Sequence, residues 1–204
     1  MIEIPTDLPA DLAPLSWLIG DWEGTGVIDY TAEDQQFSGE FTHRASFVPD
    51  GDALEYSARA WLHPEGADSA VRSAEHALIS ESGYWRLARP ATEHDVGPGL
   101  LPAARPGPAR TADDVEQLRT AEDGFELDVA VVHSNGVSEL YLGQIRGPRI
   151  DLASDAVIRG AGAKPYNAAT RLYGLVDGHL LWAWDIAALG APLTSHASAR
   201  LARL

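Results

Sequence analysis

Short runs in which hydrophobic and polar residues alternate recur along most of the chain. From Phe37 to Val48, the residues Phe41, His43, Ala45 and Phe47 share one face. A period of two residues is typical of a β-strand with one buried face. Further runs cover residues 54–62, 75–79, 83–88, 125–133, 138–146 and 150–159. The pattern predicts an all-β chain of roughly nine to eleven strands, arranged as an antiparallel barrel or sandwich.

Turn-forming residues separate these runs. Asn135-Gly136 and Asp177-Gly178 each stand between two strand-like runs, and Pro49 to Asp52 forms another turn. Asn-Gly and Asp-Gly favour the tight turns of β-hairpins, because both central residues of such a turn need positive φ. The run from His196 to Leu204 follows the last hairpin, and we expect it to be the terminal strand.

The N-terminal part predicts a short helix followed by a glycine-rich strand. Leu12, Leu15 and Leu18 recur at helical spacing, but Pro14 limits the segment to a short helix or 3₁₀ turn that ends at Gly20. In the following strand, Gly24 and Gly26 share a face with Trp22, Ile28 and Tyr30. Glycines on that face favour a bent barrel strand or a close approach of another backbone.

Residues 89–124 break the strand pattern. Five prolines lie among alanines and glycines, and an acidic stretch from Asp113 to Glu116 follows them. We interpret this segment as an insertion loop with a short helix near residues 112–119, within a single domain that spans residues 1–204.

Composition excludes several classes of function. The formal net charge of −15 disfavours binding to nucleic acids or to anionic membranes. The absence of cysteine excludes disulfides, zinc–thiolate sites, iron–sulfur clusters and thiol catalysis. No signal peptide and no apolar run long enough to cross a membrane are visible, so we expect a cytoplasmic protein.

Motifs at both ends of the chain resemble those of the nitrobindin family, haem-binding relatives of the fatty-acid-binding proteins. They are Gly20-Asp21-Trp22-Glu23-Gly24-Thr25-Gly26, Ala163-Lys164, Arg171-Leu172-Tyr173-Gly174 and the segment Pro192 to Leu201 with His196 and Ser198. The resemblance implies an up-and-down antiparallel β-barrel of about ten strands that holds one haem b. It also implies binding of nitric oxide at ferric haem and isomerisation of peroxynitrite to nitrate.

The same resemblance assigns two residues to the haem. His196 occupies the position of the proximal iron ligand, and Lys164 that of a haem-pocket residue. No catalytic side chain is expected, because the isomerisation requires no protein general base. The chain departs from the family pattern at Tyr30-Thr31, where Tyr-Pro is common, in the long insertion, and at Ile186 and Leu189, where methionines are common.

The residues themselves leave alternatives open. Strict alternation places His196 opposite the aliphatic face formed by Ala197, Ala199 and Leu201, and so outside the barrel, unless a bulge at 194–196 or a position at the rim turns it inward. Lys164, the only lysine, can pair with a haem propionate or be a solvated loop residue. Two other functions remain: a haem-free carrier of a fatty acid or other lipophile, and a ligand-free barrel whose insertion binds a partner.

Overall fold

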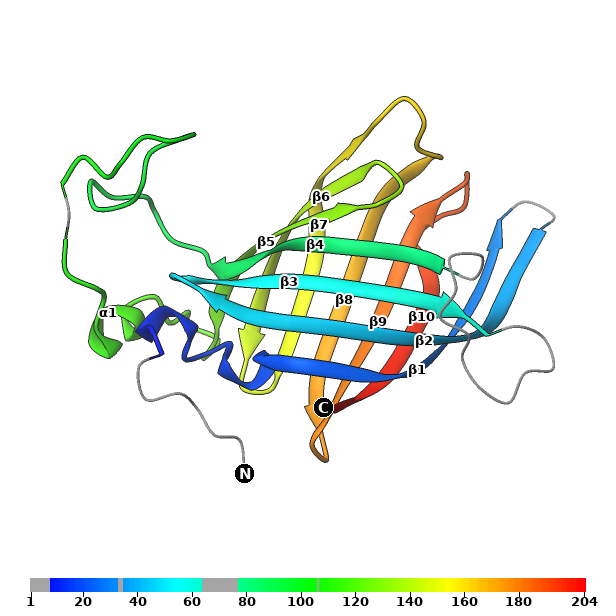
Figure 1. Ribbon diagram of the computed structural model, residues 1–204, viewed down its shortest axis with the longest axis horizontal. Helices are drawn as coiled ribbons and strands as arrows, with labels where there is room; N and C mark the ends of the chain where they lie inside the picture. The colour runs from blue at the N-terminus through cyan, green and yellow to red at the C-terminus, as the bar shows by residue number, and fades with distance from the viewer. Residues whose placement is uncertain (1–7, 33–34, 64–76, 106) are drawn as a thin grey trace.

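The computed structural model describes residues 8–32, 35–63, 77–105 and 107–204. Within them, ten antiparallel strands close into a barrel in which each strand pairs with its neighbours in sequence and β10 pairs with β1 (Figure 1). The predicted up-and-down barrel is therefore confirmed. The strands are β1 (Gly20–Ala32), β2 (Gln35–Asp50), β3 (Ala53–Leu62), β4 (Ala77–Leu87), β5 (Phe125–His133), β6 (Val137–Arg146), β7 (Arg149–Arg159), β8 (Tyr166–Val176), β9 (His179–Ala188) and β10 (Thr194–Arg203).

The predicted alternation decides which side chains fill the barrel. In β9, every second residue from Leu180 to Ala188 is buried, and the residues between them are partly exposed. Aromatic rings dominate the interior, with Trp85 in contact with Phe47, Tyr56 and Tyr173. Burial of these large rings supplies much of the hydrophobic stabilisation of the barrel.

The glycines of β1 allow the barrel to close. A Cβ atom on Gly24 would lie 2.1 Å from the carbonyl oxygen of Arg200, and one on Gly26 would lie 2.4 Å from that of Ser198. Both oxygens belong to β10, so this close approach joins the first strand to the last. The two glycines serve this contact between backbones, as one of the sequence interpretations proposed.

Two 3₁₀ turns, η1 (Ala10–Leu12) and η2 (Ser16–Leu18), cover one end of the barrel. They confirm the predicted short helical segment before Gly20. Leu12, Leu15 and Leu18 are completely buried, and the Trp22 indole donates a hydrogen bond of 2.7 Å to the Leu18 carbonyl. None of the described helices has the length and hydrophobicity that a membrane span requires.

The prediction of two short strands over residues 75–79 and 83–88 is wrong. One continuous strand, β4, replaces them from Ala77, while residues 75 and 76 lie outside the described residues. The polar sequence Ser80-Glu81-Ser82 indicated a turn, yet Glu81 is 5% exposed and points into the barrel. Its charge is compensated there by a partner on another strand.

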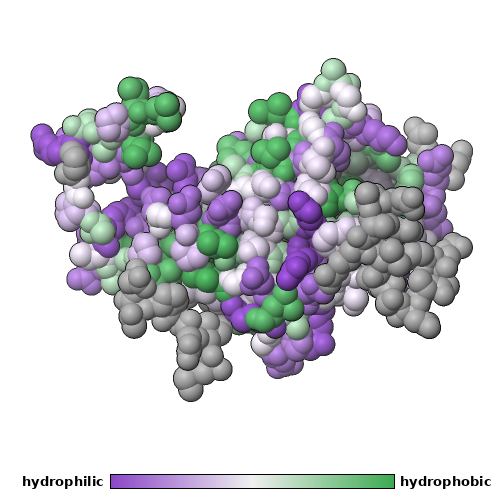
Figure 2. All heavy atoms as spheres, in the orientation of Figure 1, coloured by the Kyte–Doolittle hydropathy of each residue, from purple (hydrophilic) through white to green (hydrophobic). Residues whose placement is uncertain are grey.

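The insertion between β4 and β5 projects beside the barrel (Figure 1). It contains α1 (Ala112–Glu116), which confirms the predicted short helix, and Thr111 caps this helix through a capping box with Asp114. Arg110 pairs with Asp11 of η1 at 2.5 Å, which ties the insertion to the covered end. Figure 2 shows hydrophobic side chains at the tip of the projecting loop, where Leu100 and Leu101 are exposed.

Candidate functional site

A cavity of about 260 Å³ lies inside the barrel. Its lining includes residues near the β5–β6, β7–β8 and β9–β10 connections, so it reaches the end of the barrel opposite η1 and η2. Apolar and aromatic side chains form most of its wall, and a smaller set of polar residues lies among them. The polar set is His43, Tyr56, Glu81, His133, Asn135, Tyr166, Arg171, Tyr173 and His196.

His196 faces this cavity because β10 contains a bulge. Ser195 pairs with Asp185 and Ala197 pairs with the next residue of β9, Trp184, so His196 is the extra residue between them. A bulge places two consecutive residues on the same side of a strand. The side chain that strict alternation directed outward is thereby turned to the interior, beside Ala197.

Two aromatic side chains position the imidazole of His196. The ring meets Trp184 edge-on with centroids 5.5 Å apart, and it meets Tyr30 in the same manner at 5.3 Å. The Tyr30 hydroxyl is itself anchored, since it donates to the Ala188 carbonyl at 2.9 Å. These contacts hold the ring at the wall of the cavity.

The electrostatic surroundings keep His196 neutral. Burial, followed by the positive charge of Arg171, lowers its pKa to about 4. Its Nδ1 atom is buried and has no hydrogen-bond partner among the described residues. A neutral imidazole with an unpaired ring nitrogen is the form of histidine that binds a metal.

A second cavity histidine, His43, is engaged differently. Its Nδ1 atom accepts a hydrogen bond of 2.9 Å from the Trp182 indole, and its ring packs edge-on against that indole. Burial lowers the pKa of His43 to about 4, against an opposing effect of Glu81. The lone pair of Nδ1 is therefore already used.

The cavity floor carries a buried ion pair between Arg171 of β8 and Glu81 of β4. The guanidinium donates to both carboxylate oxygens, with Nη2–Oε1 and Nη1–Oε2 distances of 2.6 and 3.0 Å. Burial alone would raise the pKa of Glu81, but Arg171 and the other donors lower it to about 2. The Arg171 guanidinium also lies 4.0 Å above the Trp184 ring, which links this pair to the His196 side of the cavity.

His133 extends this cluster toward Glu139. Its Nδ1 atom lies 3.3 Å from Glu81 and its Nε2 atom 2.6 Å from Glu139. A second donor to Glu139 is the Tyr141 hydroxyl at 2.7 Å. The sequence alone did not indicate this cluster, because its members come from separate strands and only Arg171 belongs to one of the motifs of the family resemblance.

Three further cationic side chains, Lys164, Arg200 and Arg203, lie in different places. Lys164 is exposed in the β7–β8 connection, two residues before Tyr166, at the end of the barrel that the cavity reaches. Arg200 is exposed beside His179. Arg203 donates to the carbonyl oxygens of Trp17 and Ile19 at the covered end. Lys164 alone of these three lies near the mouth of the cavity.

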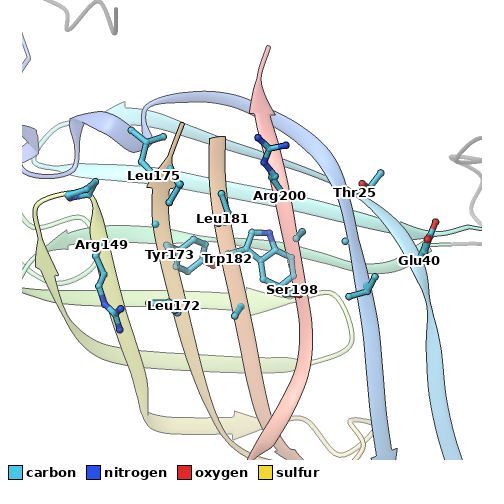
Figure 3. Close-up of a pocket in the computed structure, with 17 residues that line it drawn as sticks. Thr25, Glu40, Arg149, Leu172, Tyr173, Leu175, Leu181, Trp182, Ser198 and Arg200 are labelled. Carbon is cyan, nitrogen blue, oxygen red and sulfur yellow. The ribbon is translucent and has the colours of Figure 1, made fainter. Parts of the chain in front are cut away.

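A larger hollow of about 780 Å³ lies on the outer face of β8, β9, β10 and β1 (Figure 3). Leu172, Leu181 and Arg200 border it, and Arg149 at its edge is paired with Asp151. No histidine is among the described residues that line it. The chemistry of the smaller interior cavity therefore makes that cavity the candidate site.

Comparisons with known proteins agree with this geometry. A family model described as a THAP4-like, heme-binding beta-barrel domain matches residues 11–203. A peroxynitrite isomerase of Leifsonia xyli subsp. xyli is 60% identical over 204 residues, which cover 100% of this chain and 99% of the relative. One from Clavibacter michiganensis subsp. michiganensis is 56% identical over 205 residues and 100% of both chains. The crystal structure of Rv2717c from M. tuberculosis is similar in fold, with a TM-score of 0.66 and 24% identity over 97% of this chain and 99% of that one.

Proposed function

The chain belongs to the family of THAP4-like, heme-binding beta-barrel domains, the nitrobindin family, and we propose that it isomerises peroxynitrite to nitrate with a haem held by His196. The family match confirms the resemblance indicated by the terminal motifs. Relatives named peroxynitrite isomerase along the whole chain support the activity. The observation that carries the assignment of His196 is its neutral imidazole, turned into the cavity by the β10 bulge.

The donor chemistry of the cavity fits a haem. Imidazole nitrogen is a common axial ligand of haem iron, and the Nδ1 atom of His196 is left unpaired by the protein. A chain without cysteine cannot form the thioether bonds of a c-type haem, so the group would be held without covalent bonds to the protein, and we propose one haem b per chain. At about 260 Å³, the cavity is slightly smaller than typical ligand pockets of ~300–1,000 Å³, so a porphyrin would be only partly enclosed.

When bound, the haem supplies a ferric iron that acts as a Lewis acid toward a small nitrogen–oxygen anion. The protein supplies a fixed, neutral imidazole and an apolar wall that excludes water. This wall includes Ile28, Phe41 and Ile186. Isomerisation of peroxynitrite to nitrate neither adds nor removes a proton. The site therefore needs no general base, and we assign no catalytic side chain.

Lys164 is proposed as a contact for a haem propionate. It is the only lysine of the chain and lies exposed beside the mouth of the cavity. An exposed ion pair of this kind contributes only about 0–1 kcal/mol. Lys164 would therefore orient the porphyrin at its edge, while His196 provides most of the binding.

A carrier of fatty acids is not favoured. The cationic group positioned to bind a ligand carboxylate inside the barrel is Arg171, and Glu81 already occupies its guanidinium through two hydrogen bonds. A carboxylate ligand would have to displace an internal ion pair.

The test is haem reconstitution of wild type, His196→Ala and a surface control, His179→Ala, followed by absorbance spectroscopy and a nitrate assay with peroxynitrite. We expect a Soret band and accelerated nitrate formation in wild type and the control, and loss of both in His196→Ala. An equally strong, unshifted band in His196→Ala would remove His196 from the site. Haem binding without acceleration would contradict the isomerase activity alone, and co-purified lipid without haem uptake would favour the carrier.

A further inference from the structure

The carboxylate of Glu81 occupies a complete carboxylate-binding site. Arg171 donates to both of its oxygens, the Tyr56 hydroxyl donates to Oε2 at 2.7 Å, and His133 Nδ1 lies 3.3 Å from Oε1. A guanidinium fork supported by a hydroxyl donor is a strong arrangement for binding a carboxylate. All four side chains are buried, so these interactions are little weakened by solvent.

This binding site faces the ligand cavity. Glu81, Arg171, Tyr56 and His133 all belong to the cavity lining. The apolar wall beside them includes Ile79 and Ile186. A molecule with a carboxylate head and a short aliphatic tail would match these surroundings, with its head on Arg171 and its tail along the wall. The side chain of Glu81 fills the place of that head.

We propose that Glu81 determines the ligand specificity of the barrel. Arg171, Tyr56 and His133 form a receptor for aliphatic monocarboxylates in the cavity wall, and the carboxylate of Glu81 fills this receptor and so excludes them. This inference does not depend on haem binding or on the isomerase activity. It assigns the exclusion of one ligand class to a single side chain.

The receptor keeps balanced charges when Glu81 is removed. Arg171 and His133 face two carboxylates, Glu81 and Glu139. Without Glu81, the Arg171 guanidinium keeps the Glu139 carboxylate as a counter-charge, 3.8 Å away. Added acetate would restore the second carboxylate and accept the hydrogen bonds that Glu81 accepted from Arg171 and Tyr56.

The test measures the thermal stability of the full-length Glu81→Ala variant in the presence of acetate, with acetamide as the uncharged probe of the same shape. We expect the melting temperature to rise with the logarithm of acetate concentration, as mass action requires for a ligand of the native state, and acetamide to have no such effect. Affinity should increase from acetate to butyrate by about fourfold for each methylene buried, or ~0.8 kcal/mol.

Two variants serve as controls. In Glu81→Gln the side chain still fills the receptor, so acetate should leave its melting temperature as insensitive as that of wild type. In Glu81→Ala/Arg171→Met the cation is missing, so the response should disappear. An equal response of Glu81→Ala to acetate and acetamide would overturn the proposal. Failure of Glu81→Ala to fold in saturating acetate would also overturn it, since acetate in a preformed receptor reproduces the lost contacts.

Discussion

The Nε2 atom of His133 lies 2.6 Å from Oε2 of Glu139, in a cluster whose side chains are almost completely buried. The other ring nitrogen of His133 faces Glu81, so each nitrogen points at a carboxylate, which can only accept hydrogen bonds. Together with Arg171, which pairs with Glu81 at 2.6 Å, these side chains form one buried network that joins β4, β5, β6 and β8.

Removal of Arg171 should strongly destabilise the protein. Arg171→Met leaves Glu81 buried without its main counter-charge, and breaking a buried pair in this way typically costs about 3–5 kcal/mol. The double variant Arg171→Met/Glu81→Gln no longer contains the unpaired buried charge of Glu81, so we expect it to recover at least half of the loss. Urea unfolding of both single variants and the double variant measures the coupling. A double variant less stable than Arg171→Met would contradict this account.

The haem-free protein should lose stability as the pH falls from about 6.5 toward 4. The pKa values of His43 and His196 lie near 4 in the folded state, below the ordinary histidine value of 6.5, so the unfolded chain binds more protons in this window. Their contribution is complete above pH 6.5 and is lost as the pH approaches 4. The loss should be of order 3 kcal/mol for His43 and smaller for His196, because solvent reaches part of that ring.

His43→Asn identifies the source of this slope, because asparagine offers the Trp182 indole an acceptor and does not titrate. The free energy of unfolding of this variant, measured in urea at several pH values, should fall less steeply between pH 6.5 and 4. Parallel curves for wild type and variant would exclude His43 as a cause. Glu81, whose pKa is lowered to about 2, should lose its contribution to stability in a separate window, as the pH falls from the ordinary value of 4.5 toward 2.

His196→Gly should bind haem again when free imidazole is added. The substitution leaves a space beside Trp184 and Tyr30 that exogenous imidazole can fill. We expect a weak Soret band without imidazole and a histidine-like spectrum with it. Absorbance titration with imidazole measures the effect. A Soret band that increases with imidazole in His196→Gly and stays unchanged in wild type would support ligation at this position, whereas no increase in His196→Gly would count against it.

Lys164→Met should weaken haem binding by up to about fivefold at low salt without shifting the absorbance maximum, because the contact proposed for this lysine is with the edge of the porphyrin and not with the iron. The difference should diminish in 1 M salt, where the Debye length is about 3 Å. Lys164→Arg is the matched control and should bind like wild type. A salt-independent loss in Lys164→Met would argue against a propionate contact.

Gly24→Ala should destabilise the barrel by at least about 2 kcal/mol. Its Cβ atom would meet the Arg200 carbonyl at 2.1 Å and the Leu201 Cα at 2.8 Å, and two paired backbones cannot separate without loss of hydrogen bonds. Gly162→Ala is the control, because no atom lies within 4 Å of its added Cβ, and it should change stability by less than about 0.5 kcal/mol. Chemical denaturation compares the two, and equal effects would contradict a closure role for Gly24.

The sequence by itself determined the family and every strand except β4, which it divided into two. Side-chain alternation is a local property with a period of two residues, so the interior faces of β1, β2 and β3 could be read directly from Trp22, Phe41 and Tyr56. The turn at Asp177-Gly178 could likewise be predicted from these two adjacent residues. The terminal motifs identified the family because they stand in a fixed order around a strand-rich middle.

Only the tertiary structure decided what those strands bring together. The direction of His196 depends on one extra residue in the pairing of β10 with β9, and a bulge of this kind reverses the parity that a sequence pattern predicts. Glu81 looked like part of a turn because its partner, Arg171, is 90 residues away in the sequence. A buried charge is stable only beside its counter-charge, and closure of the barrel is what places the two side chains within hydrogen-bonding distance.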